Sequence, residues 1–166
     1  MVTTFRQSRI VAPRTPPVGR RRRAALAIRA AMWKGLRMAG KRAAAALANE
    51  PYINLATFRR SGAAVETPVW CAPLDGKLYV VTDGTSAKVK RIRATKRIRV
   101  APCGVRGAVT GAWVEGRARI VSDAALVARA HAALVEKYGW QMWLLDTGSR
   151  LFGRYARRAY LELTLA

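Results

Sequence analysis

Apolar and polar residues alternate in short runs after Pro51, and this period of two is typical of strands with one buried face. The clearest run closes the chain, where Leu161, Leu163 and Leu165 alternate with Tyr160 and Glu162. Strands are expected over 52–58, 65–73, 78–83, 97–103, 112–121 and 159–165. Short glycine-bearing links join the first three, so the pattern predicts antiparallel hairpins.

Helical patterns fall between and before these strands. A short basic helix is expected over 86–94, and an amphipathic helix over 123–138 with Ser122 or Asp123 as its cap. The apolar segment 139–154 fits either a second helix or a packed loop. The chain is therefore expected to be α+β and mainly β: a six-stranded antiparallel barrel with helical inserts and an N-terminal helix.

Charge divides the chain into parts. The 166 residues include 31 Lys and Arg against 9 Asp and Glu, a net charge of +22, and no acidic residue precedes Glu50. Three domains are expected: a basic disordered arm over 1–23, an Ala- and Arg-rich helix over 24–48, and a barrel domain over 50–166.

The arm has several interpretations. It is suited to contact nucleic acid or an acidic membrane surface, but a solvated arm or an untranslated leader fits equally well, because Met32 or Met38 offers an in-frame start. Basic residues interrupt every apolar run of 24–48 well before it reaches the roughly 20 residues that a membrane span needs. The same charges argue against this segment as the apolar region of a secretory signal. A cytoplasmic protein is expected.

A search for reactive side chains mostly eliminates candidates. His131 is the only histidine and lies mid-helix among alanines, which favours a structural role. Cys71 and Cys103 are expected to be reduced core thiols, and no metal site is expected. Glu66 and Glu115 lie in predicted strands and nothing marks them as an acid and base pair. If the chain is an enzyme, a cofactor must carry the chemistry.

One turn does predict a binding site. Thr85 and Ser86 lead into the basic helix, whose first backbone N–H groups lack helical partners, and Lys88 lies within the first turn. Such a terminus attracts phosphate and other anions. Ser86 can equally be a simple N-cap, so both interpretations stay open.

Four segments together resemble a known family: LATFRRSGAAVETPVW, LYVVTDGTSAKVKRIR, RIRVAPCGVRGAVTG and WVEGRARIV. They are similar to the pyridoxamine 5'-phosphate oxidase-like reductases, and specifically to the branch that uses the deazaflavin coenzyme F420. The resemblance covers about residues 50–166. It implies a split β-barrel that forms a homodimer with two cofactor sites at the subunit interface.

The resemblance also implies the cofactor-binding residues, which are Thr67, Pro68, Val69, Trp70, Val81, Thr82, Ser86, Ala87, Lys88, Val109, Thr110 and Gly111. FMN-binding members usually carry an arginine just before the phosphate-binding lysine, where this chain has Ala87. A small residue there is typical of the F420 branch, so F420 is the expected cofactor and FMN the alternative. Lys90, Arg91, Arg93 and Arg106 are either a track for the polyanionic tail of F420 or solvated charges.

The implied activity is hydride transfer from reduced F420 to a conjugated, electrophilic small molecule. Trp70 and Trp113 are candidates for stacking near the ring or for plain core positions. An FMN-binding oxidase-like protein and a non-catalytic F420 carrier remain alternatives. A basic nucleic-acid-binding protein is disfavoured, because the strands lack the interleaved aromatic and basic residues of a stacking platform.

Overall fold

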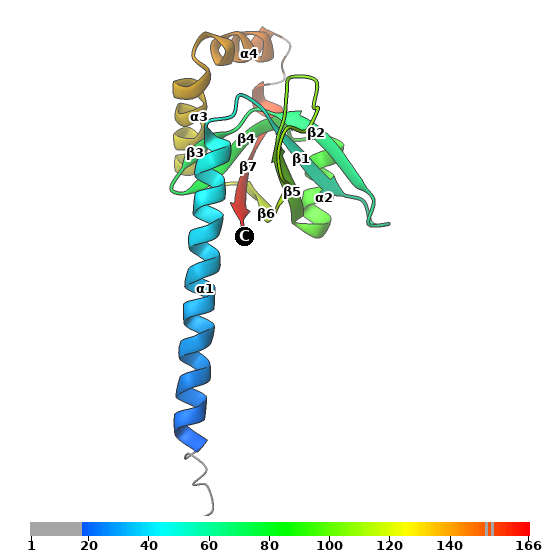
Figure 1. Cartoon of the computed structure of the whole chain (residues 1–166). Coiled ribbons are helices and arrows are strands. Elements are labelled where there is room, and N and C mark those ends of the chain that lie inside the picture. Colours follow the sequence, from blue (N-terminus) through cyan, green and yellow to red (C-terminus); the bar gives the residue numbers. More distant parts are fainter. Residues whose placement is uncertain (1–17, 152, 154) are drawn as a thin grey trace, which may run out of the picture. The chain divides into compact units, whose positions relative to one another are not determined.

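The computed structural model describes residues 18–151, 153 and 155–166, and Figure 1 shows its elements. Helix α1 (Val18–Ala48) crosses the boundary between two units of the chain, which are divided between Gly35 and Leu36. The helix begins at Val18, before the predicted start at residue 24. Arginine is a good helix former, and Arg20–Arg23 continue the helix. The remainder of the predicted arm, 1–17, lies outside the described residues.

The second unit is built on one curled antiparallel sheet, which confirms the predicted α+β split barrel (Figure 1). Its order is β2-β1-β5-β6-β7-β4-β3 in the described part of the chain. The strands are β1 (Ile53–Phe58), β2 (Ala64–Val69), β3 (Ala72–Leu74), β4 (Lys77–Asp83), β5 (Arg97–Pro102), β6 (Val114–Val121) and β7 (Arg158–Leu165).

The described sheet has seven strands where the sequence predicted six, because the run 65–73 is broken at Trp70 and Cys71. The first part, β2, pairs with β1, and the second, β3, pairs with β4 at the opposite edge. At the break, the Cys71 N–H donates to the Tyr138 hydroxyl at 3.0 Å and not to a neighbouring strand. Pro68 lies in the edge strand β2, as its missing N–H predicted.

The predicted inserts are helices α2 (Ala87–Thr95) and α3 (Ala124–Tyr138). Asp123 caps α3, since its Oδ1 accepts from the Leu126 N–H at 2.6 Å. The ambiguous segment after Gly139 is mainly helical, as α4 (Trp140–Leu151), and a short 3₁₀ turn, η1 (Tyr155–Arg157), leads into β7.

The two faces of the sheet contact different helices. On the inner face, Leu55, Leu78 and Leu161 pack with side chains of α2 and of the C-terminal part of α1. On the outer face, Tyr79 and Tyr160 pack with side chains of α3 and α4. The outer layer thus includes both helices that follow β6, α3 and α4.

The end of α1 is tied to the last strand. Gly40 lies so close to β7 that a Cβ there would overlap the Leu165 carbonyl, so only glycine permits this approach. Ala44 and Leu47, one and two turns further on, are buried in the barrel core. The final turns of α1 are thus part of the barrel domain.

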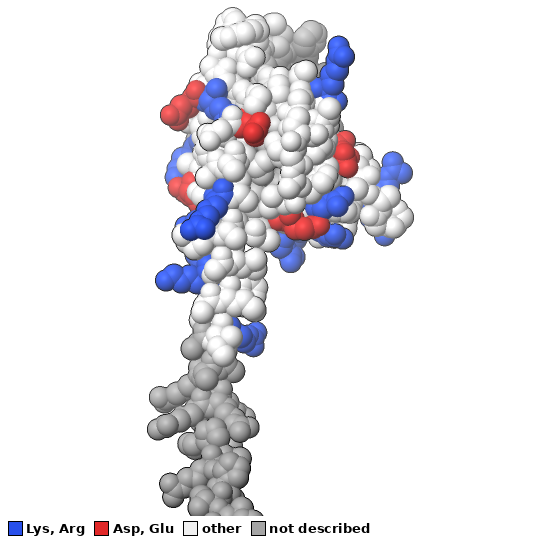
Figure 2. Space-filling model, in the orientation of Figure 1, with Lys and Arg blue, Asp and Glu red and all other residues white. Residues whose placement is uncertain are grey.

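No helix in the described part of the chain is long and apolar enough to cross a membrane. Figure 2 shows lysine and arginine side chains spread over several elements of the visible face, with fewer acidic side chains among them.

Candidate functional site

The turn before α2 is ordered by its own side chains. The Asp83 carboxylate Oδ1 accepts from the Thr85 N–H at 2.8 Å and from the Thr85 hydroxyl at 2.7 Å. The Gly84 N–H donates to the Arg157 carbonyl at 2.7 Å, which anchors the turn to the segment before β7. These bonds fix the position from which α2 starts.

Ser86 occupies the N-cap position of α2, yet its side chain makes no capping hydrogen bond. Its Oγ is buried and has no hydrogen-bond partner among the described residues. The amides of Ala87, Lys88 and Val89 begin the helix, where no preceding turn supplies acceptors. Ser86 is therefore the N-cap by position, but its hydroxyl does not cap the helix, and this hydroxyl and the helix terminus remain to meet an acceptor group.

Lys88 adds a positive charge to this terminus. Burial lowers the pKa of its ammonium group, and the neighbouring charge of Arg91 lowers that pKa further. Among the described residues, no carboxylate lies within ion-pair distance of Lys88. A half-buried cation without a counter-ion is costly, and a bound phosphate or phosphodiester would relieve that cost.

A pocket of about 300 Å³ opens beside Lys88. The described residues that line it are Tyr52, Pro68, Val69, Trp70, Val81, Lys88, Val105 and Leu145. Five of these are residues that the sequence assigned to the cofactor. They come from the end of β2, from β4 and from α2, so the fold joins the apolar strand segment and the anion-binding turn in one space. We call this space the Lys88 pocket.

The other predicted residues lie around the Lys88 pocket or away from it. Thr67 and Thr82 are half-buried in β2 and β4, and Ala87 is the exposed first residue of α2. None of them, nor Ser86, is among the described lining residues.

The predicted segment 109–111 is not part of the Lys88 pocket either. Val109, Thr110 and Gly111 are exposed on the loop after β5, where the Thr110 N–H donates to the Pro102 carbonyl at 2.9 Å. The same loop contributes Val105 to the pocket instead.

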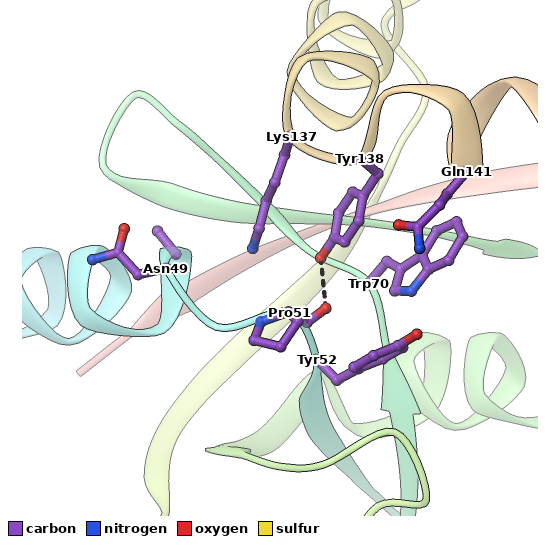
Figure 3. A pocket seen from close by; sticks show the side chains of 8 residues that line it. Asn49, Pro51, Tyr52, Trp70, Lys137, Tyr138 and Gln141 are labelled. Atoms are coloured by element: carbon purple, nitrogen blue, oxygen red, sulfur yellow. Dashed lines mark hydrogen bonds between the residues drawn. The ribbon is translucent and has the colours of Figure 1, made fainter.

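A second pocket of about 460 Å³ also lies beside Trp70 (Figure 3). Trp70 and Tyr52 line both pockets. The Trp70 ring stacks on Tyr138, with ring centres 4.9 Å apart and planes inclined by 16°. The Tyr138 hydroxyl lies 3.0 Å from the Pro51 carbonyl, to which it can donate, and it accepts from the Cys71 N–H. Helix α3 thereby fixes the tryptophan against which a flat ring can lie.

Sequence reasoning missed Tyr52, Val105 and Leu145 as lining residues. Tyr52 directly precedes β1, and its position beside Trp70 follows from the pairing of β1 with β2. Leu145 lies on α4, whose helical state the sequence left open. No local pattern marks any of the three.

The other candidates divide into exposed and structural residues. Lys90, Arg93 and Arg106 are exposed, whereas the Arg91 Nε donates to the Thr57 hydroxyl at 2.7 Å. Trp113 lines neither pocket. The Arg99 guanidinium lies over its ring at 5.2 Å, a position consistent with a strand-packing role.

The family model described as pyridoxamine 5'-phosphate oxidase matches residues 39–162. The chain belongs to the pyridoxamine 5'-phosphate oxidase family. Members of this family often bind flavin, and the family includes oxidoreductases. A search of the curated proteins finds no match.

Several solved structures share the fold of this chain at low sequence identity. A conserved hypothetical protein of Mycobacterium tuberculosis is similar with a TM-score of 0.56 and 20% identity, over 75% of this chain and 78% of that one. The heme storage protein HutZ of Vibrio cholerae has a TM-score of 0.56 and 11% identity, over 72% and 84%. A putative 5-nitroimidazole antibiotic resistance protein of Bacteroides thetaiotaomicron has a TM-score of 0.55 and 7% identity, over 75% and 79%.

Proposed function

We propose that this protein binds coenzyme F420 in the Lys88 pocket and catalyses hydride transfer from the reduced deazaflavin to a conjugated, electrophilic small molecule. The observation that carries the proposal is the convergence of Pro68, Val69, Trp70, Val81 and Lys88 on one pocket. Lys88 gives the pocket a positive charge that suits a phosphodiester. The apolar and aromatic side chains of the pocket suit a flat ring joined to that phosphodiester.

Each part of the pocket has a separate role in this proposal. Lys88 and the first amides of α2 hold the phosphodiester, and the unpartnered Ser86 hydroxyl donates to one of its oxygens. Val69, Trp70 and Val81 cover the ring and exclude water from it. When bound, the cofactor supplies the hydride, and the proton that completes the reduction comes from solvent or from a residue near the substrate.

FMN is the second candidate cofactor, because flavin binding is frequent in the family. Ala87 favours F420, since it offers no second positive charge at the phosphate. Heme, which HutZ stores, is not favoured. The only histidine, His131, lies outside the Lys88 pocket and has both ring nitrogens engaged by Tyr160 and Asp146, so it is not placed as an axial ligand.

Titration of the purified protein with F420 and with FMN tests the proposal. Wild type is expected to bind F420 more tightly than FMN. Lys88→Ala is expected to weaken F420 binding about tenfold or more, because a charge-assisted phosphate contact contributes roughly 1.5–3 kcal/mol. Arg117→Ala is the control, since Arg117 is an exposed cation on β6 outside the lining of the Lys88 pocket and should change affinity little.

The outcomes separate the alternatives. Tighter binding of FMN than of F420 would identify FMN as the cofactor. F420 binding without turnover of any acceptor, such as a quinone or a nitroaromatic compound, would favour a non-catalytic carrier. Equal affinity of wild type and Lys88→Ala for F420 would contradict the assigned phosphate site.

We also propose that the protein is a cytoplasmic homodimer whose partner completes each cofactor site. Both cysteines are free and buried, which suits a reducing compartment. Val109 is 40% exposed on a loop away from its own pocket, as expected for a residue that faces the partner's cofactor.

Val109→Glu is therefore expected to raise the dimer dissociation constant by about tenfold or more, because it places a charge in an apolar interface. Sedimentation measurements over a concentration series check this. Val135→Glu is the matched control, because Val135 is also 40% exposed but lies on α3. A wild-type protein that remains monomeric at high concentration would rule out the proposed dimer.

A further inference from the structure

Helix α4 presents large apolar side chains to solvent. The exposed fractions are 69% for Trp140, 63% for Trp143, 51% for Leu144 and 79% for Leu151. The spacing of these four residues places them on one side of the helix. An amphipathic helix of a globular domain normally turns such a side toward the core, whereas here it faces outward. We call these four residues the α4 apolar face.

The opposite side of α4 is anchored to the domain. The Arg158 guanidinium of β7 donates to the Asp146 carboxylate and, at 2.8 Å, to the Ser149 hydroxyl. His131 Nε2 of α3 lies 3.2 Å from the Asp146 carboxylate. Met142 is fully buried and packs in the outer core. Because these contacts fix the rotation of α4 about its axis, the helix cannot turn its tryptophans inward without breaking them.

The α4 apolar face therefore has the character of a binding surface. A contiguous group of exposed, large apolar side chains marks a contact with another protein or with a lipid bilayer. Two of its four members are tryptophans, and tryptophan is enriched where proteins meet the interfacial region of a bilayer. None of the four residues is among the described lining residues of the Lys88 pocket or of the pocket of Figure 3.

Charge favours a bilayer of anionic lipids as the occupant. The α4 apolar face has no acidic member, since Asp146 lies on the anchored side of the helix. Arg150 in the last turn of α4 and Arg157 of η1, which packs against α4, are both exposed. Figure 2 shows no acidic side chain at the top of its view, where α4 lies. Cations beside an apolar helix face attract anionic lipid headgroups.

We propose that the α4 apolar face binds the surface of an anionic lipid bilayer, with α4 parallel to the surface and Trp140 and Trp143 in the interfacial region. The 12 residues of α4 are too few to cross a bilayer, which needs about 20, so the helix lies on the membrane. Arg150 and Arg157 lie near the lipid phosphates. The proposal does not depend on F420, because the α4 apolar face contributes no described residue to the Lys88 pocket.

The experiment mixes the full chain with vesicles of equimolar phosphatidylcholine and phosphatidylglycerol that carry bromine on their acyl chains. Bromine quenches the fluorescence of tryptophans that enter the bilayer, so wild type is expected to bind and to lose fluorescence. Leu144→Glu keeps both tryptophans but places a carboxylate against anionic lipids. This variant is expected to weaken vesicle binding about tenfold or more and to reduce the quenching.

Val135→Glu is the matched control, because it makes the same change of charge at a residue that is 40% exposed on α3. Its vesicle affinity should stay within about twofold of wild type. The match in charge is needed because a chain with a net charge of +22 is attracted to anionic vesicles without any insertion. Both substitutions are at exposed positions, so the fold should persist.

Three outcomes would overturn the proposal. Vesicle binding without quenching in wild type would show attraction by charge alone, and so would equal losses of affinity in Leu144→Glu and Val135→Glu. A Leu144→Glu variant that binds vesicles as wild type does but dissociates more readily into monomers would assign the α4 apolar face to a contact between two copies of this chain.

Discussion

Replacing Leu161 with alanine is expected to lower the free energy of unfolding by about 2–5 kcal/mol, because the truncation removes buried methyl groups and leaves a cavity in a packed core. Leu161 is 0% exposed in the middle of β7, opposite Val80 of β4 and Ile120 of β6. These three strands are adjacent in the sheet, in the order β6-β7-β4. Denaturant unfolding measured at a single pH checks this prediction.

Thr164→Ala is the control for Leu161→Ala. Thr164 lies on the same strand but is exposed, so its replacement should change the free energy of unfolding by less than about 0.5 kcal/mol. Equal effects of the two variants would contradict the assignment of the leucine face to the core.

Replacing Glu162 is expected to have the second large effect on the free energy of unfolding. This carboxylate is 4% exposed and accepts from Lys77 Nζ at 2.7 Å, from the Tyr79 hydroxyl at 2.8 Å and from Arg119 Nη2 at 2.6 Å. Burial raises the pKa of Glu162, but the hydrogen bonds from Arg119, Lys77 and Tyr79 outweigh burial and lower that pKa to about 2. The ionised form is therefore favoured in the folded state.

The sign of the pH effect follows from this lowered pKa. The stabilisation by ionised Glu162 is fully present above the ordinary pKa of about 4.5 and is lost as the pH falls through about 2. The shift corresponds to roughly 3 kcal/mol. Glu162→Gln is expected to lower the free energy of unfolding by about that amount at pH 7, and the difference from wild type should shrink between pH 4.5 and 2.

Unfolding of both proteins across this pH range measures the difference directly. Glu115→Gln is the control, because Glu115 is an exposed carboxylate, 3.4 Å from Arg97, and exposed pairs contribute about 0–1 kcal/mol. A Glu162→Gln difference that stays constant down to pH 2 would show that ionisation of Glu162 does not stabilise the fold.

The sequence by itself determined the elements whose signal is local. Alternation identified β7 and its leucine face, helical spacing identified α3, and the turn before Lys88 indicated an anion site at the start of α2. These features follow from backbone geometry and from the nearest neighbours in the chain. The match to the family, over 39–162, is likewise contained in the sequence.

Only the tertiary structure decided the features that depend on distant residues. The run 65–73 alternates without interruption, but Tyr138 of α3 bonds Cys71 and ends β2 before β3 begins. Tyr52 and Leu145 reach the Lys88 pocket from separate elements. His131, which the sequence favoured as structural, contacts Asp146 of α4 and Tyr160 of β7. Such positions depend on contacts between residues far apart in the chain, and no local period encodes those contacts.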